Sequence, residues 1–548
     1  VDYTVGTGGL HRLTGDFNFH TGENAALRLN ALVHDADNWG ARQRKLGVAP
    51  TFRWGIGTRD EFLVGLYHLE IDGRPLYNHP WLVENGRARA VLPARNFYGL
   101  ANDHLDTSAT IATLGHVHRF DHDAQLKTTL RHGRYERDLL ASAIGFATPT
   151  TRATLSDATV LRRNPKARIG VSDLTQLTSD YAAAFGAHQL LAGVDLYHDD
   201  AQRNNAATAG LAPPPTTTVG RPDDGAIRPD TRGPVPMNTF EARDIGVYAQ
   251  DTYSLTPTVK LVGGVRFDRF TATYRNATGA LTGKRTDNLW SPRVGVLWQP
   301  SDTSSYYVSY GTSYNTSGDA YQFAVNFNAG QQRIANTPPE KSRNLEVGGK
   351  WEVFERRALV GLAAFYSEKY NERNTDPDTA ATQELLSGKR HAAGLEFNAA
   401  GRIDPRWEVF FNHTWIPEAE IDESNVVVPA SGGGAQARGD RPGLTPRHSG
   451  SLWTTYRVLP RLRVGAGVTY RGEQNPEGNR AVIAPGFAVV DAMAEYTINE
   501  SWAAKLNVSN LFDRLYADSL YRGFYSPGAP RPVELALKTM FWSPCCWT

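Results

Sequence analysis

A pair of histidines is the first group in the sequence that could do chemistry. His116 and His118 stand two residues apart in a segment that alternates like a β-strand, and His122 follows just beyond it. Side chains at positions i and i+2 share one face of a strand, so two imidazoles could in principle hold one metal ion. A lone histidine pair without a carboxylate partner is usually not a metal site. We therefore predict no metal centre.

The remaining candidate groups fit no catalytic or cofactor motif. Gly263 and Gly264 are followed by a strand pattern and not by a helix, which argues against a dinucleotide-binding fingerprint. Cys545 and Cys546 are adjacent at the end of the chain. Adjacent cysteines cannot close a useful loop, and these two lack metal-ligand spacing with any histidine. The sequence thus indicates neither an enzyme nor a bound cofactor.

Composition narrows the class of protein. The 548 residues include 58 Lys and Arg against 57 Asp and Glu, so bulk charge favours no nucleic-acid partner. No apolar run reaches the roughly 18 residues that a transmembrane helix needs. A strand that crosses a membrane alternates lipid-facing and lumen-facing residues, however, so its mean hydropathy resembles that of a soluble protein. No linker divides the chain, which favours one large closed sheet.

Short segments with strict alternation recur from end to end. Clear examples are residues 259–267, 345–351, 502–508 and 533–541, each with one apolar and one polar face. The residues expected to face outward are Val265, Phe267, Leu345, Val347, Leu506, Val508, Leu535 and Leu537, and those expected to face a lumen are Lys260, Glu346, Lys350, Lys505 and Lys538. Alternation alone does not separate a soluble sandwich from a membrane barrel.

The lengths of the connections make that distinction. Very short links (58–60, 121–123, 256–258, 300–303, 404–406 and 498–501) alternate with very long ones (72–106, 137–171, 200–243, 314–342, 369–389, 419–447 and 511–530). Outer-membrane barrels are built in this way, with tight periplasmic turns and long extracellular loops. We predict an all-β fold, a transmembrane antiparallel β-barrel of about 22 strands. Residues 1–5 should pair with residues 533–541 to close it.

Aromatic residues near the strand ends are expected to form the girdles at the membrane interfaces. They are Trp54, Phe120, Tyr253, Trp298, Trp351, Trp407, Tyr456 and Trp502. Ordinary strand aromatics are the alternative interpretation.

Several longer segments carry a family resemblance. They are LNVSNLFDRLYADSLYRGFYSPGAPRPVELALKTMF (506–541), GGVRFDRF (263–270), PEKSRNLEVGGKW (339–351), AFYSEKYNERNTDPD (364–378), PRHSGSLWTTY (446–456) and NHPWLVENGRARAVLPARNFYGL (78–100). The first of these resembles the closing signature of the TonB-dependent receptors. The last one resembles the catecholate-siderophore branch of that family. The resemblance covers essentially the whole barrel.

This resemblance implies an outer-membrane receptor of a Gram-negative bacterium, with a ferric siderophore as transported ligand and no cofactor. It also implies an N-terminal plug that contacts the TonB complex, and we expect that plug to be missing because residues 1–9 already read as the first strand and its loop. The barrel domain is then residues 1–541, and residues 542–548 form an atypical C-terminal tail. The other implied partners are outer-membrane lipid and the barrel-assembly machinery, the latter through the strand ending at Phe541.

A ferric tris-catecholate complex is bulky, aromatic and triply negative, so a receptor must offer cations and ring faces at its outer mouth. Arginine suits this task because it is always charged and stacks on flat rings. The candidates for ligand contact are Tyr77, Trp81, Arg95, Phe97, Tyr98, Tyr314, Tyr321, Phe323, Arg333, Tyr370, Arg373, Tyr521 and Arg522. The alternative is that these aromatics pack the outer loops against one another.

Two other functional classes compete with a siderophore receptor. A passive porin-like channel would share the barrel, but an open barrel of this width would leak toxic solutes. A soluble β-rich enzyme or lectin would leave the alternation of short and long loops unexplained. Within the receptor class, a hydroxamate, haem, nickel or sugar complex would suit the same architecture.

Overall fold

The computed structural model describes residues 1–121, 123–204, 208, 210–315, 338–373, 385–424, 438–476, 482–521 and 523–541. The regular secondary structure of the described chain is β-strand, apart from the single turn η1 (Asn38–Gly40). None of the described segments forms a helix long and apolar enough to cross a membrane.

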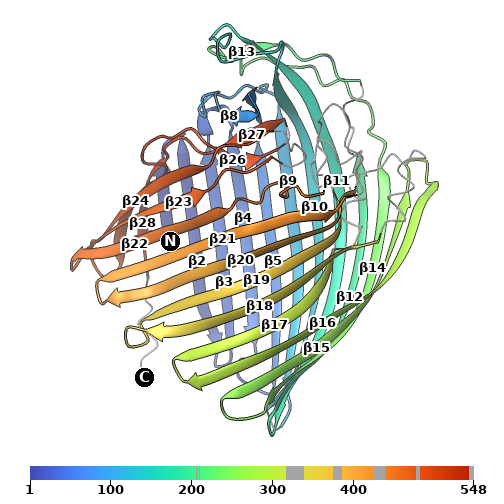
Figure 1. The fold of residues 1–548 in the computed structure, drawn as a ribbon, viewed down its shortest axis with the longest axis vertical. Coiled ribbons are helices and arrows are strands. Elements are labelled where there is room, and N and C mark those ends of the chain that lie inside the picture. The colour runs from blue at the N-terminus through green and yellow to red at the C-terminus, as the bar shows by residue number, and fades with distance from the viewer. Residues whose placement is uncertain are drawn as a thin grey trace.

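One antiparallel sheet forms the body of the molecule and closes on itself (Figure 1). It comprises 23 strands, and without the two-residue β13 (Thr217–Thr218) the other 22 follow one another around a ring in chain order. They are β1 (Asp2–Gly6), β2 (Leu10–Gly22), β3 (Ala25–Ala36), β4 (Gln43–Trp54), β5 (Asp60–Gly73), β9 (His104–Arg119), β10 (Ala124–Phe146), β11 (Val160–Phe185), β12 (His188–Asn204), β14 (Asn238–Ser254), β15 (Val259–Arg275), β16 (Leu281–Ser301), β17 (Ser304–Asn315), β18 (Glu340–Val353), β19 (Ala358–Arg373), β20 (Leu385–Asp404), β21 (Trp407–Glu423), β22 (His448–Leu459), β23 (Leu462–Arg471), β24 (Phe487–Thr497), β25 (Trp502–Val508) and β28 (Val533–Thr539).

The first and last strands complete the ring. Val5 of β1 lies opposite His11 of β2 on one side and Leu535 of β28 on the other. The Val1 ammonium group also donates to the Thr539 carbonyl at 2.8 Å. Closure leaves no free sheet edge, which is what a lipid environment requires of a β-structure. The predicted all-β barrel of about 22 strands and the predicted pairing of its ends are both confirmed.

The two faces of the barrel wall differ in chemistry as the alternation predicts. Val347 and Val308, which are cross-strand partners, are 51% and 45% exposed in the isolated chain, and Leu535 is 50% exposed. Such apolar exposure marks the face that lipid covers. Glu346 lies on the opposite face, where it accepts a hydrogen bond from the hydroxyl of Tyr307.

An aromatic girdle lies at the end of the barrel with the short turns. Trp54, Phe120, Trp298, Trp407 and Trp502 are all more than a third exposed, and each lies within a few residues of such a turn. Amphipathic rings at this depth suit a membrane–water interface.

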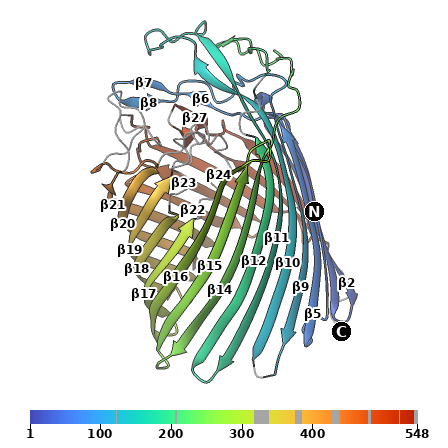
Figure 2. The ribbon, with the colours of Figure 1, turned by 90° about the vertical axis from the view of Figure 1, so that its right-hand side faces the viewer.

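The strands β10 and β11 extend far beyond the bilayer. They contain 23 and 26 residues, whereas about 9–11 tilted residues suffice to cross a membrane. Their upper ends rise above the rest of the wall (Figures 1 and 2). The predicted loop at 137–171 is therefore wrong in extent, because pairing continues to Phe146 and resumes at Val160. Above the membrane both faces are wet or covered by loops, so no apolar alternation marks the strands.

Two small sheets cover the mouth of the barrel at the end with the long connections (Figure 2). One consists of β6 (His79–Pro80), β26 (Ala517–Leu520) and β27 (Phe524–Pro527), and the other of β7 (Leu82–Glu84) and β8 (Arg87–Arg89). We call these two sheets and the loop segments around them the hood.

Candidate ligand-binding site

The hood is held together by contacts between loops that are far apart in the sequence. Strand β6 of the first long connection pairs with β27 of the last one. The indole of Trp81 donates to the carbonyl of Tyr521 at 3.0 Å, and its ring lies 4.5 Å from that of Tyr525. A core of buried residues fills the space between these loops and the loop that follows β23. This hood core consists of Trp81, Ala88, Val482, Ala484, Ala517, Leu520 and Tyr525.

Three candidates for ligand contact lie inside the packing of the hood. Trp81, Phe97 and Tyr98 are 6%, 4% and 0% exposed. The Tyr98 hydroxyl donates to the carbonyl of Val219, and burial raises the pKa of this phenol. These three rings hold loops together, which is the alternative interpretation that the sequence left open for them.

Three further candidates stand at the surface of the hood. Arg95 forms an ion pair with Asp513 at 3.1 Å and is half-exposed. The ring of Tyr77 lies 6.1 Å from that of Phe524, and the ring of Tyr521 lies 4.6 Å from the same phenylalanine. The structure therefore brings together Tyr77 and Tyr521, which are more than 400 residues apart in the chain.

The described candidates on the middle strands, Tyr314 and Tyr370, lie on the outer face of the wall. Tyr314 on β17 shares a face with Val308, and Tyr370 on β19 shares that same face through its pairing with Lys341. Cations cover both rings, Lys341 at 5.5 Å from Tyr314 and Arg343 at 5.0 Å from Tyr370. Four candidates lie outside the described residues: Tyr321, Phe323, Arg333 and Arg522. The side chain of Arg373 is likewise not described.

Three arginines line the wall beneath the hood, and none of them is among the candidates from the sequence. Arg137, Arg168 and Arg203 come from the adjacent strands β10, β11 and β12. The register places Arg137 and Arg203 on either side of Gly170, and Arg168 two residues before it, so all three share one face. They line a cavity of about 170 Å³ together with Tyr135. We call this group the arginine cluster.

The arginine cluster faces the barrel mouth and not the lipid. On β10 the even-numbered residues, such as the exposed Leu130 and His132, lie on the outer face. Arg137 is odd-numbered and therefore lies on the inner face. Arg137 also interacts electrostatically with Tyr77 of the hood. Guanidinium groups suit the recognition of anions, since each offers a rigid fork of donors.

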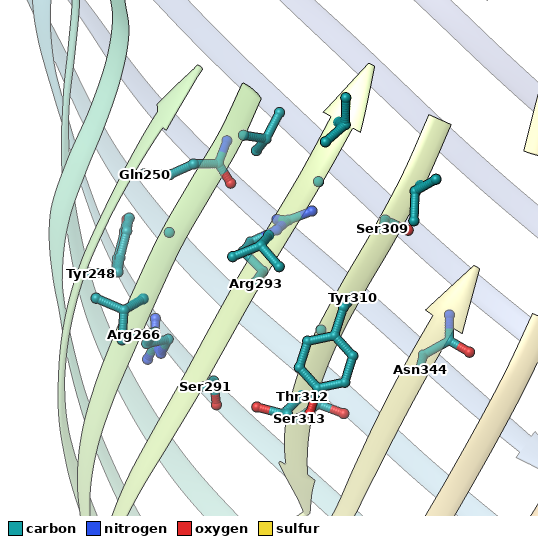
Figure 3. A pocket seen from close by; sticks show the side chains of 18 of the residues that line it. Tyr248, Gln250, Arg266, Ser291, Arg293, Ser309, Tyr310, Thr312, Ser313 and Asn344 are labelled. Carbon is teal, nitrogen blue, oxygen red and sulfur yellow. The ribbon is translucent and has the colours of Figure 1, made fainter. Parts of the chain in front are cut away.

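A second, larger cavity of about 720 Å³ lies along the inner wall over β12 and β14–β18 (Figure 3). Arg266 stands in it and pairs with Asp268 at 2.6 Å and with Asp195 at 3.3 Å. Gly246 makes this possible, because a Cβ there would lie 2.2 Å from the Arg266 guanidinium. Arg266 is thus paired within the barrel wall, which leaves a polar surface suited to a hydrated passage.

A buried histidine joins the first and last long connections within the hood. His79 is 0% exposed, and the rings of Tyr98 and Tyr525 meet it edge-on at 5.3 and 5.7 Å. Neither ring nitrogen has a hydrogen-bond partner among the described residues. Burial lowers the pKa of His79 to about 4.

The hood is therefore expected to loosen as the pH falls. An unfolded histidine titrates near 6.5, so between pH 6.5 and 4 the open hood binds a proton that the closed hood does not. Stability of the hood, complete above pH 6.5, should drop by roughly 2 kcal/mol between pH 7.5 and pH 5. Amide hydrogen exchange of β26 and β27, corrected for intrinsic rates, measures this drop. His79→Phe should largely remove it.

Asp103 provides the internal check on that experiment. Burial raises the pKa of this hood carboxyl group, so its protonation favours the closed hood as the pH falls, opposite to the effect of His79. This contribution of Asp103 remains in the His79→Phe variant. If the His79→Phe protein loses protection at pH 5 as much as the wild type, His79 is not the titrating group.

Comparisons with known proteins agree with this architecture. Residues 13–511 match the family described as TonB dependent receptor-like, beta-barrel. A probable TonB-dependent receptor, BfrD of Bordetella pertussis, is 30% identical over 589 aligned positions that cover 99% of this chain and 76% of that protein. The catecholate siderophore receptor Fiu of Escherichia coli O157:H7 is 28% identical, with 98% and 75% covered.

Solved structures show the same fold. The siderophore receptor PiuA of Acinetobacter baumannii superposes with a TM-score of 0.85 at 21% identity, covering 98% of this chain and 80% of that one. The closed form of the ferric-catecholate import receptor Fiu from E. coli K12 gives 0.84 at 24% identity, with 98% and 81% covered. Together with the closed ring of 22 strands, these matches establish that the chain belongs to the TonB-dependent receptor family and is an outer-membrane β-barrel protein of a Gram-negative bacterium.

Proposed function

We propose that this protein takes up ferric siderophores of the catecholate type and binds them at the arginine cluster beneath the hood. The single observation that carries the proposal is the convergence of Arg137, Arg168 and Arg203 on one cavity at the mouth of the barrel. A ferric tris-catecholate carries three negative charges, and three guanidinium groups match them in number and sign. Relatives named as catecholate siderophore receptors support the same ligand class.

The surroundings of the cluster suit the aromatic part of such a ligand. Tyr135 lines the cavity directly, and Tyr77 of the hood interacts with Arg137. Catechol rings stack on phenol faces and on guanidinium planes. In this proposal Tyr77, Tyr521 and Arg95 meet the ligand first at the hood, and the arginine cluster receives it next. The buried Trp81, Phe97 and Tyr98 hold the hood in shape.

Transport in this proposal involves no chemistry on the ligand and no resident cofactor. Energy comes from the TonB complex, on which the family depends. We further propose that phospholipid and lipopolysaccharide surround the apolar face, and that the C-terminal strand ending near the exposed Phe541 engages the barrel-assembly machinery.

A binding comparison tests the proposed ligand class. Quenching of tryptophan fluorescence in the purified protein would be followed with an iron(III) tris-catecholate and with a neutral iron(III) tris-hydroxamate of similar size. The catecholate complex should bind at least about tenfold more tightly at low salt, and the preference should shrink at high salt because partly exposed charges are screened. Equal affinities for the two complexes would overturn the catecholate assignment.

A further inference from the structure

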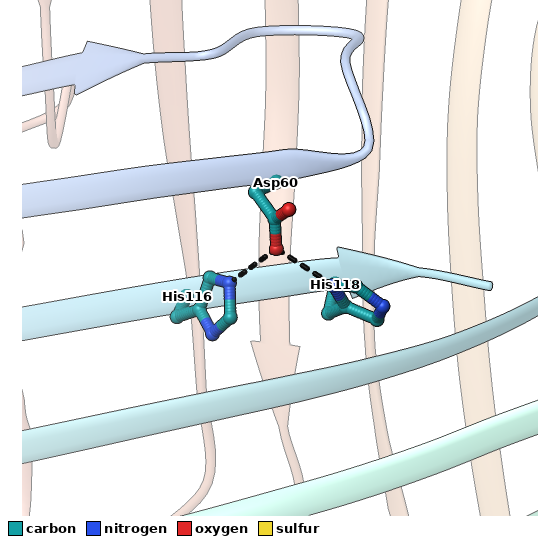
Figure 4. A group of neighbouring side chains, drawn as sticks. All are labelled: Asp60, His116 and His118. Atoms are coloured by element: carbon teal, nitrogen blue, oxygen red, sulfur yellow. Dashed lines mark hydrogen bonds and ion pairs between the residues drawn. The ribbon is translucent and has the colours of Figure 1, made fainter.

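The structure completes the histidine pair that the sequence left without a carboxylate. Asp60 begins β5 and lies directly opposite His118 of β9 in the strand register. Its Oδ1 atom lies 2.9 Å from Nε2 of His116 and 2.6 Å from Nδ1 of His118 (Figure 4). Asp60 is 56 residues away from His116 in the chain, and no motif in the sequence links the two.

We propose that Asp60, His116 and His118 bind a divalent transition-metal cation of the zinc class. One ligand atom from each residue lies within 4.8 Å of the other two. In a tetrahedral zinc site with bonds of about 2.0–2.1 Å, ligand atoms lie about 3.3 Å apart. The three groups therefore need to move by less than about 1 Å to replace their hydrogen bonds with metal bonds.

The chemistry of the donors selects the metal. Two imidazoles and one carboxylate suit Zn²⁺, Ni²⁺ or Cu²⁺, whereas Mg²⁺ and Ca²⁺ prefer oxygen ligands. Three protein ligands leave a fourth position open to water. The carboxylate also offsets one of the two charges of the cation.

The location of the site distinguishes it from the proposed siderophore site. Asp60 follows the short turn after β4, and His118 lies just before the short turn after β9, so the group stands at the periplasmic end of the barrel. Its face is the outer one, because Val64 and Leu66 of β5 and Leu114 of β9 lie on it and are more than 40% exposed. The ring of Phe62 stacks on His116 at 4.5 Å, and that of Phe120 meets His118 at 4.6 Å. This packing orients both imidazoles within the aromatic girdle.

Titration of the purified barrel with Zn²⁺ by calorimetry tests the proposal, with no siderophore present. The loss of an outer-shell partner commonly weakens metal affinity by about 10–100-fold. His118→Ala, which removes a ligand, and Asp60→Asn, which replaces the charged carboxylate by a weaker, neutral amide oxygen, should therefore each weaken Zn²⁺ binding at least tenfold. His188→Ala is the matched control. His188 pairs with Asp251 at 2.6 Å on the same outer face and near a short turn, and among the described residues this pair has no second histidine as a third possible ligand.

A spectroscopic measurement on the wild-type protein makes the test independent of how the variants fold. One equivalent of Cu²⁺ should give an electron paramagnetic resonance spectrum with coupling to two equatorial nitrogens. That spectrum, together with weaker Zn²⁺ binding in His118→Ala and unchanged binding in His188→Ala, is the expected result. Wild-type Zn²⁺ affinity in both ligand variants, or a Cu²⁺ spectrum without two coupled nitrogens, would overturn the proposal.

Discussion

Replacing Arg137, Arg168 and Arg203 together by glutamine is expected to weaken binding of an iron(III) tris-catecholate by about a thousandfold. A hydrogen bond to a charged group contributes roughly 1.5–3 kcal/mol, so three of them would contribute roughly 4.5–9 kcal/mol to the binding free energy. We reduce that sum to about 4 kcal/mol because the cavity is open to the barrel mouth, where solvent screens charge. Glutamine keeps most of the side-chain length and some hydrogen-bonding capacity, so the loss isolates charge.

The same strand provides the matched control. Arg134 lies three residues before Arg137 and on the opposite face, where it pairs with Glu136 at 2.8 Å and with Asp173 at 3.2 Å. Arg134→Gln removes one positive charge at nearly the same height but outside the mouth. It should leave the dissociation constant unchanged within about twofold, because surface ion pairs contribute little.

Substitution of the three arginines by lysine separates charge from shape. Lysine keeps the positive charge but presents a point charge where arginine presents a planar fork that also stacks on rings. We expect the triple lysine protein to recover part of the affinity and most of its salt dependence. Triple glutamine and Arg134→Gln proteins with equal affinity would show that the cluster does not contact the ligand.

Much of the fold follows from the sequence because the membrane imposes its rules locally. A strand that separates lipid from a wet lumen must alternate, as residues 345–351 do, and closure of the ring demands that the two terminal strands pair. These requirements leave their mark within a few residues of each position. Above the bilayer this requirement for alternation no longer applies. The paired upper parts of β10 and β11 therefore carry no alternating pattern, and the sequence did not predict them.

The site was harder to predict because it depends on which distant segments meet. Trp81 and Tyr98 have the residue types of ligand contacts, yet both are buried. Trp81 packs against the last long connection, and Tyr98 packs against Ile144, Leu161 and Val219. Arg137, Arg168 and Arg203 form a cluster only through the register of three strands. In the sequence, Arg137 and Arg168 merely stand near the two ends of the expected loop 137–171, and Arg203 stands near the start of the expected loop 200–243.

The two faces of the barrel wall should respond differently to a new charge. Val308 and Ser309 are consecutive residues of β17, so they lie at the same depth and point to opposite sides of the wall. Val308 is 45% exposed on the apolar face together with its partner Val347, and Ser309 shares the inner face with its partner Glu346. Arginine on the lipid face of a barrel near the bilayer midplane is destabilising by about 2–4 kcal/mol.

Val308 lies two residues beyond Tyr306, the cross-strand partner of the girdle residue Trp298, and so stands between the interface and the midplane. Val308→Arg should therefore lower the free energy of unfolding in lipid vesicles by about 1–2 kcal/mol, and Ser309→Arg by clearly less. The second arginine enters a hydrated space in which Glu346, the cross-strand partner of Ser309, offers a carboxylate. Denaturant unfolding followed by tryptophan fluorescence measures both values under identical conditions. If Ser309→Arg proves the more damaging substitution, the polar face touches lipid and the wall is inverted. The arginine cluster would then lie outside the barrel mouth, because continuous pairing from β10 to β17 fixes its face relative to Ser309. One pair of variants thus tests the orientation on which the proposed binding site depends.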